Sequence, residues 1–167
     1  GKDIRKDMKT GAIHVSMQAY VDNLEQVKVP RERRADSEAK LVPRELTELR
    51  GVNGGLQWVQ YQLRPDLAFG VSVSQGATSD ARVHHLFETQ QLVSRAKQHR
   101  DFELVFQPLD LDRGGFMAVS DAGLGGIGQS GEAGTVADVK MRSQGGYLVL
   151  AHYGRRGKFN LLDWKSH

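Results

Sequence analysis

Cysteine is missing from this chain of 167 residues. Its absence excludes disulfide bonds and thiolate metal sites, and it fits an intracellular location in the cytoplasm or the nucleus. No apolar run approaches eighteen residues, so no membrane-spanning helix is expected. The first nine residues are mostly charged and lack the apolar core of a signal peptide. Because the chain begins with Gly1 rather than Met, we expect it to be a piece of a longer protein.

A large excess of one charge is also missing. The chain has 23 Lys and Arg against 20 Asp and Glu, which gives a net charge of +3 at pH 7. The small excess is spread along the first two-thirds of the sequence, whereas nucleic-acid binders often carry a denser basic stripe. A mixed, solvated surface therefore explains the charge at least as well as a nucleic-acid-binding face does.

Glycine is unevenly distributed and divides the chain in two. Twelve of the 19 glycines lie after position 113. The boundary is marked by residues that favour turns, Pro108, Gly114 and Gly115. Helical periodicity dominates before this point, and strand-type alternation dominates after it. We therefore expect a first unit over residues 1–107 and a second over residues 108–167.

The first unit is predicted to contain two strands, a short helix and a charged linker. Apolar and polar residues alternate at 13–17 and again at 102–106, which is typical of strands. Residues 19–26 fit a helix. Residues 28–43 are charged and contain two prolines, so we interpret them as a surface linker.

Three longer helices are predicted to make up most of the first unit. An apolar stripe over residues 46–63 has the spacing of one helical face. Gly54 and Gly55 interrupt the stripe and indicate either the close approach of another backbone or a break in the helix. A second helix can open at Pro65, and a third can follow an N-cap at Ser79.

The second unit is predicted to be a small sheet. Strand patterns occur at residues 116–121, 147–153 and 159–164, with turn residues between them. Successive strands of this kind most simply form an antiparallel meander. Trp164 lies near the chain end, where we expect it to be loosely held, because three strands alone leave an apolar face uncovered.

Four short motifs follow one another in the sequence: Leu63-Arg64-Pro65-Asp66, Ser120-Asp121-Ala122, Gly145-Gly146-Tyr147 and Asp163-Trp164-Lys165-Ser166. In this order they resemble copia-type retrotransposon Pol polyproteins, from the connection region of the reverse transcriptase into the N-terminal half of RNase H. The resemblance implies an α+β fold. A mainly helical connection segment over residues 1–107 would precede a three-stranded antiparallel sheet of an incomplete RNase H-like fold over residues 108–167.

The same resemblance implies a site and partners. Asp121 would be the first catalytic carboxylate and a ligand of Mg²⁺ in a site where several carboxylates hold two metal ions. The family's other carboxylates have no counterpart here, and Gly123 and Leu124 replace an Asp and a Trp that are common in the family. The parent polyprotein would synthesise DNA on RNA and cleave RNA in RNA–DNA hybrids. This chain, which would contact the hybrid and the rest of the polyprotein, would be inactive by itself.

Two other interpretations of the whole chain stay open. It could be a non-catalytic nucleic-acid-binding module, or a decayed protein derived from a retroelement. Arg155, Arg156 and Lys158 form a small basic hairpin tip that could contact a phosphate. A solvated turn is the favoured alternative for these three residues.

Further motifs have stronger structural than functional explanations. Residues 123–128 spell Gly-x-Gly-x-x-Gly after a strand, but dinucleotide binding needs a helix to follow, and a β-turn loop is favoured. His85 and Glu88 lie one helical turn apart, next to His84, which more often marks a polar face or a helix-stabilising contact than a metal site. The aromatic residues that could stack on bases are Trp58, Tyr61, Tyr147 and Trp164. For Trp58 we expect packing in the core instead.

Overall fold

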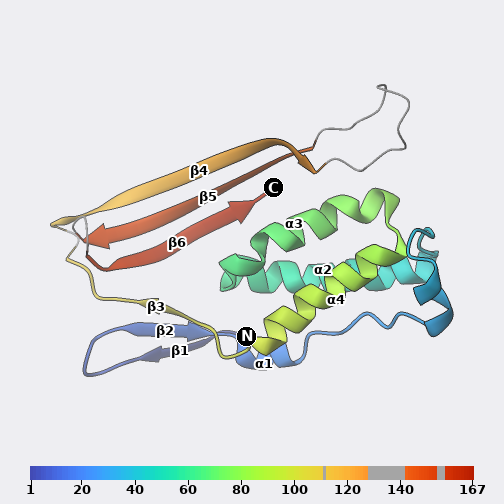
Figure 1. The fold of residues 1–167 in the computed structure, drawn as a ribbon. Coiled ribbons are helices and arrows are strands. Elements are labelled where there is room, and N and C mark those ends of the chain that lie inside the picture. Colours follow the sequence, from blue (N-terminus) through green and yellow to red (C-terminus); the bar gives the residue numbers. More distant parts are fainter. Residues whose placement is uncertain (111, 128–141, 154–156) are drawn as a thin grey trace.

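The computed structural model describes residues 1–110, 112–127, 142–153 and 157–167 (Figure 1). Within these residues the chain has four α-helices and two three-stranded antiparallel sheets, so the predicted α+β class is confirmed. No helix in the described ranges is long and apolar enough to cross a membrane.

The first sheet joins the two ends of the helical segment. It contains β1 (Asp3–Lys6), β2 (Ile13–Ser16) and β3 (Glu103–Phe106), in that order across the sheet. The strands at β2 and β3 were predicted. The strand β1 was not, because it has a single large apolar side chain, Ile4, which is exposed. The β1–β2 turn requires Gly11, whose φ of 74° is left-handed.

The long helix α2 (Pro43–Gln62) confirms the prediction from the apolar stripe. Its buried apolar side chains are Leu49, Val52, Leu56 and Val59. The two glycines do not break the helix. A Cβ atom at Gly55 would lie 3.1 Å from the side chain of Leu24, so glycine makes room here for a packed side chain, whereas a Cβ at Gly54 would meet open space.

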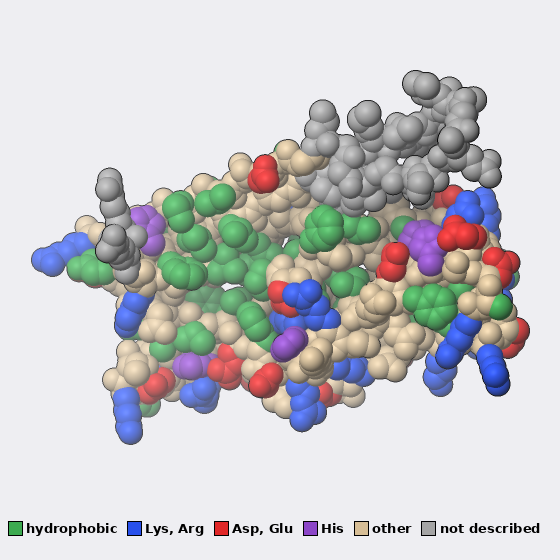
Figure 2. All heavy atoms as spheres, in the orientation of Figure 1, with side chains coloured by type: hydrophobic (Ala, Val, Ile, Leu, Met, Phe, Trp, Pro, Cys, Tyr) green, Lys and Arg blue, Asp and Glu red, His purple; other side chains and the backbone are tan. Residues whose placement is uncertain are grey.

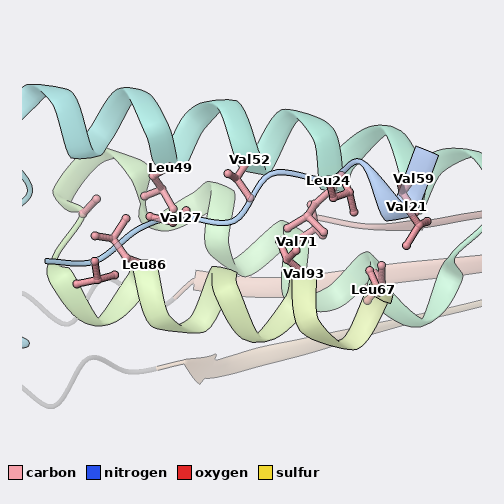
Figure 3. Close-up of a cluster of buried hydrophobic side chains, with 14 of the residues drawn as sticks. Val21, Leu24, Val27, Leu49, Val52, Val59, Leu67, Val71, Leu86 and Val93 are labelled. Atoms are coloured by element: carbon pink, nitrogen blue, oxygen red, sulfur yellow. The ribbon is translucent and has the colours of Figure 1, made fainter. Parts of the chain in front are cut away.

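The apolar core lies among the helices. Helices α3 (Ala68–Gly76) and α4 (Val83–Gln98) pack on α2, and the short α1 (Gln18–Asp22) with the segment after it closes the cluster (Figure 3). The residues labelled in that view are Val21, Leu24, Val27, Leu49, Val52, Val59, Leu67, Val71, Leu86 and Val93. Each helix contributes its apolar side chains to this one cluster, and their burial stabilises the packing of the helices.

The predicted helix over residues 19–26 is wrong beyond Asp22. The Asn23 side chain donates a hydrogen bond to the Ala19 carbonyl oxygen, and the chain then leaves the helix and buries Val27 and Val29. The charged stretch after Val29 is largely exposed, as predicted, but it also contains a short 3-10 helix (Arg31–Ala35).

The predicted N-cap at Ser79 is also wrong. Residues Ala77–Asp80 form a 3-10 helix, and α4 begins only at Val83. The reason is a side chain within the helix: Nδ1 of His85 accepts a hydrogen bond of 2.9 Å from the backbone N–H of Arg82. Histidine thus closes the first turn of α4 in place of a Ser or Thr cap.

The second sheet confirms the predicted antiparallel meander. It contains β4 (Gly114–Ile127), β5 (Arg142–Tyr153) and β6 (Phe159–Ser166), with β5 in the middle. Val119 pairs with Leu148, and Leu148 pairs with Trp164, so these three side chains share one face. The register of β5 and β6 shifts after Val149, where β6 has one extra residue.

The second sheet is seated on the helices (Figure 1). Trp164 is only 6% exposed, and its indole N–H donates a hydrogen bond of 2.8 Å to the Gln60 carbonyl oxygen near the end of α2. Asn160 exchanges two hydrogen bonds with the backbone of Gln107, at 2.7 and 2.8 Å. The prediction that Trp164 would be loosely held is therefore wrong, because the end of α2 supplies both the packing and the acceptor.

Candidate functional site

An open groove lies between the second sheet and the start of α3, and Asp121 is on its wall. The groove has a volume of about 440 Å³. The helical side contributes Pro65, Ala68 and Phe69, whereas Val119 and Asp121 come from the sheet. Trp164 and Leu148 also line it, so the groove is mostly apolar with a carboxylate at its edge.

Strand alternation explains the position of Asp121. Successive side chains on β4 point to opposite faces, and Val119, Asp121 and Gly123 all line the groove. Asp121 pairs with Gly146, which pairs with Ser166, so only small residues flank the carboxylate and it stays exposed. Its Oδ1 accepts a hydrogen bond of 2.8 Å from the backbone N–H of Ala122.

The described residues of the groove do not by themselves fit a magnesium pair. Two metal ions need several carboxylates around them, and among the described residues that line the groove Asp121 is the one carboxylate. Across the described part of the chain, no three His, Asp or Glu side chains form a group that could hold a metal ion. Asp121 alone therefore supplies at most one ligand, and no reaction step can be derived through a metal here.

Arg64 directly precedes Pro65, a lining residue of the groove, and its side chain contacts Asp66 and the end of α4. It is 1% exposed, and its guanidinium donates to both carboxylate oxygens of Asp66 at 2.8 and 2.9 Å. Its Nη1 also donates to the carbonyl oxygens of Ala96 and His99 at the end of α4, and its charge lies 5.2 Å from the ring centre of Phe102. A bidentate pair of this kind fixes geometry as well as charge, so Arg64 holds Pro65 and the start of α3 in place at the groove.

The charges around Asp66 favour its ionised form. Burial alone would raise the pKa of Asp66, but the hydrogen bond and charge of Arg64, with the charge of Arg95, outweigh it and lower the pKa below its ordinary value. A second pair acts similarly at the start of α2. There the hydrogen bond from Arg33 lowers the pKa of Glu45 despite its burial.

The histidine pair is a structural feature of α4. Nδ1 of His85 is engaged by the Arg82 backbone, and burial together with the neighbouring His84 lowers the pKa of His85. His84 lies beside Glu38, with 3.3 Å between its Nδ1 and the carboxylate. These contacts agree with the interpretation of the motif as a helix-stabilising one.

The basic hairpin tip is described only in part. Arg155 and Arg156 lie outside the described residues. Lys158 is exposed and lines a small pocket together with Asp110, so an acidic side chain accompanies it there. The strand β4 continues to Ile127, and Gly128, the last glycine of the Gly-x-Gly-x-x-Gly motif, lies outside the described residues.

The aromatic residues have different environments. Trp58 is 48% exposed on α2, so the prediction that it packs in the core is wrong, and Tyr61 on the same helix is also exposed. The Tyr147 hydroxyl donates a hydrogen bond of 3.0 Å to Asp163, which raises the pKa of Tyr147.

Phe69 is the groove residue that the sequence reasoning missed. It is 58% exposed and lines the groove from α3. Leu67 and Val71 are four residues apart and buried, so they mark one helical face, and Phe69 between them must lie on the other. The helical period was the available signal.

No protein-family model, curated protein or solved structure matches this chain. The groove and its surroundings therefore have to be interpreted from their own geometry and from the residues of the sequence.

Acidification is expected to destabilise the chain in two pH windows. The pKa of His85 is depressed in the fold, so the unfolded chain takes up the proton first, and stability falls as the pH drops below about 6.5. Asp66 and Glu45 also have depressed pKa values, so their contribution is present above about pH 4 and is lost below it. Urea unfolding midpoints over a pH series measure both windows.

A matched pair of variants isolates the upper window. His85→Gln should remove the loss that begins near pH 6.5, because glutamine accepts a hydrogen bond without titrating. His99→Gln changes an exposed histidine and should leave that loss unchanged. If the loss of stability near pH 6.5 persists in His85→Gln, a group other than His85 must cause it.

Proposed function

We propose that this chain is the end of a reverse transcriptase connection region joined to the first three strands of an RNase H-like domain, from a copia-type Pol polyprotein. In this proposal residues 1–107 act as a scaffold, and residues 108–167 contribute the strand that carries Asp121. The parent polyprotein synthesises DNA on RNA and cleaves RNA–DNA hybrids with Mg²⁺, whereas this chain supplies one carboxylate and some contact with the nucleic acid.

One observation carries the proposal. Two motifs that are far apart in the sequence, Arg64-Pro65-Asp66 and Ser120-Asp121-Ala122, each contribute one residue to the lining of the same groove. Pro65 lines the groove on the helical side, held by the buried pair of Arg64 and Asp66, and Asp121 lines it on the sheet side. This shared position supports the proposal that the two motifs belong to one site.

The three-stranded meander gives further support. A carboxylate on the first strand, at a point where only glycine and serine flank it, is accessible to a ligand from solvent. The same geometry limits what the chain can do, because a two-metal mechanism needs further carboxylates. The proposal is therefore a scaffold with an incomplete site rather than a working nuclease.

The purified chain is expected to be inactive on a labelled RNA–DNA hybrid with Mg²⁺, and equally inactive in primer extension. Gel analysis of the products measures both activities, with a complete ribonuclease H as the positive control. Asp121→Asn should be indistinguishable from the wild-type chain. Mg²⁺-dependent cleavage by the wild type that disappears in Asp121→Asn would show that a full site is present and would refute the scaffold proposal.

A non-catalytic nucleic-acid-binding module is the second candidate. It is favoured by the two exposed aromatic residues, Trp58 and Tyr61, which lie one turn apart on α2 and could stack on bases. The salt dependence of hybrid binding separates the candidates, because each phosphate contact adds to the slope of log affinity against log salt. A shallow slope fits the scaffold proposal, and a steep one fits the binding module.

A further inference from the structure

A short strap, residues 37–41, crosses the first turn of α4. Backbone hydrogen bonds of 2.9 to 3.0 Å hold it there, and they run from Leu41 to Ala81, from Val83 to Ala39 and from His84 to Ser37. The first N–H groups of a helix have no partner within the helix. The carbonyl oxygens of the strap therefore cap the start of α4.

His85 fixes the turn to which the strap binds. Its Nδ1 accepts a hydrogen bond of 2.9 Å from the backbone N–H of Arg82, so this nitrogen carries no proton. The His85 residue is 8% exposed, and its ring centre lies 4.0 Å from that of His84. Protonation would remove the acceptor and would place a positive charge at the start of a helix, where the macrodipole disfavours cations. The closed strap therefore requires a neutral His85.

The charged groups around His85 oppose one another. Burial, the largest cause, lowers the pKa of His85, and the charge of His84 lowers it further. The carboxylates of Glu88, on α4, and Glu38, on the strap, act in the opposite direction but do not outweigh the burial. Figure 2 shows histidine, acidic and basic side chains gathered at the end of the molecule where α4 begins.

The remaining charges at this end are paired with one another. The Arg82 guanidinium lies 3.7 Å from Glu38 and 3.6 Å from Asp80. Asp80 also pairs with Lys40 of the strap, at 3.0 Å. These pairs are partly or largely exposed, so each of them contributes little to holding the strap closed.

The C-terminal side of the strap is anchored to α2. Nη2 of Arg33 donates a hydrogen bond of 2.8 Å to the Lys40 carbonyl oxygen, and the same guanidinium donates twice to the Glu45 carboxylate, at 2.9 Å. Glu45 also accepts a hydrogen bond from the backbone N–H of Val42. Because the hydrogen bond from Arg33 lowers the pKa of Glu45, this anchor persists at pH values where His85 becomes charged.

We propose that residues 37–41 form an acid-sensitive strap, which leaves the start of α4 when His85 takes up a proton and stays tethered to α2 through Arg33 and Glu45. Opening frees the first N–H groups of α4. It also separates Ala39 and Leu41 from the core cluster against which they pack.

The uptake of one proton sets the size of the effect. In the open strap the pKa of His85 returns toward its ordinary value of about 6.5. The ratio of open to closed strap therefore rises by at most about tenfold for each pH unit below that value, until the closed form also takes up the proton.

Amide hydrogen exchange of the full chain, between about pH 7.5 and pH 5, measures this opening. Leu41 and Val83 donate two of the hydrogen bonds that hold the strap. Their protection, corrected for the intrinsic exchange rate, should fall below about pH 6.5 by at most about tenfold per unit. Urea should accelerate their exchange less than that of Leu56 in the buried face of α2, because a local opening exposes little surface.

Two substitutions of His85 imitate the two states of the strap. His85→Gln keeps an acceptor at the third helical position, as in a capping box, but does not titrate, so the protection of Leu41 and Val83 should not change with pH. His85→Ala has no acceptor and should lower the protection of both amides already at neutral pH. His84→Gln is the matched control and should keep the pH dependence of the wild type.

Three results would overturn the proposal. The first is protection of Leu41 and Val83 that does not change with pH in the wild type, and the second is a pH dependence that persists in His85→Gln. The third is exchange of both amides with the same urea dependence as Leu56, since the strap would then open only when the whole chain unfolds. The wild type and His85→Gln decide all three, so the test does not require His85→Ala to fold.

Discussion

Replacing Trp164 with alanine is expected to lower the free energy of unfolding by about 3–5 kcal/mol. The indole is almost fully buried between β6 and the end of α2, and its N–H satisfies the Gln60 carbonyl oxygen. The substitution removes the packing and leaves that buried oxygen without its donor, and both effects destabilise the fold. Urea denaturation followed by circular dichroism measures the change.

The chain supplies its own control for this experiment. Trp58 is the other tryptophan, and it is about half exposed on α2. Trp58→Ala should change stability by about 0.5 kcal/mol or less, as is usual for surface substitutions. Equal losses in the two variants would contradict the seating of the second sheet on α2.

Replacing Arg64 with methionine is expected to cost about 3–5 kcal/mol, the range for removing one partner of a buried ion pair. Arg64 donates to Asp66 and to two carbonyl oxygens at the end of α4, so a methionine removes both hydrogen bonds to the carboxylate and one donor from each carbonyl. The pKa of Asp66 should also rise, because the hydrogen bond and charge that lower it are gone. Denaturation midpoints at pH 7 and pH 4 measure both effects.

Arg95→Met is the matched control for Arg64→Met. Arg95 also approaches Asp66, at 3.5 Å, but its side chain is more than half exposed. Exposed ion pairs contribute about 0–1 kcal/mol, so this variant should remain close to the wild type. A loss in Arg95→Met as large as that in Arg64→Met would mean that Asp66, and not the buried guanidinium, organises this region.

Regular periodicity made the longer elements predictable. The stripe of α2 appears in the structure as the buried face of that helix. The strands expected from alternation in the second sheet also appear, although most of their large apolar side chains are exposed. Element ends were less predictable. The start of α4 depends on a histidine that reaches back to Arg82, and histidine is not among the residues usually expected at a helix start.

Both tryptophans lie in environments that differ from the predicted ones. Trp58 was expected in the core and is exposed, whereas Trp164 was expected to be loose and is buried. A strict helical period separates Trp58 from the buried face marked by Leu56 and Val59. No local pattern reveals the environment of Trp164, because its partner Gln60 lies in a distant part of the chain.

Of the two walls of the groove, only the one formed by the sheet was predictable from the sequence. Asp121 was found from its position in a strand and from the resemblance of the motifs around it. The opposite wall, with Phe69 and Pro65, depends on how the second sheet sits on α3, which is a tertiary arrangement. The division at residues 107 and 108 stays a prediction, since the two stretches contact each other through Trp164 and Asn160.

The central claim is that this chain is part of a copia-type Pol polyprotein, and the sequence of its transcript on both sides of the segment tests it most directly. The account predicts one continuous reading frame, with Tyr-x-Asp-Asp upstream of Gly1 and a helical segment that supplies a further Glu downstream of His167. A transcript whose frame contains neither feature would contradict the proposed function.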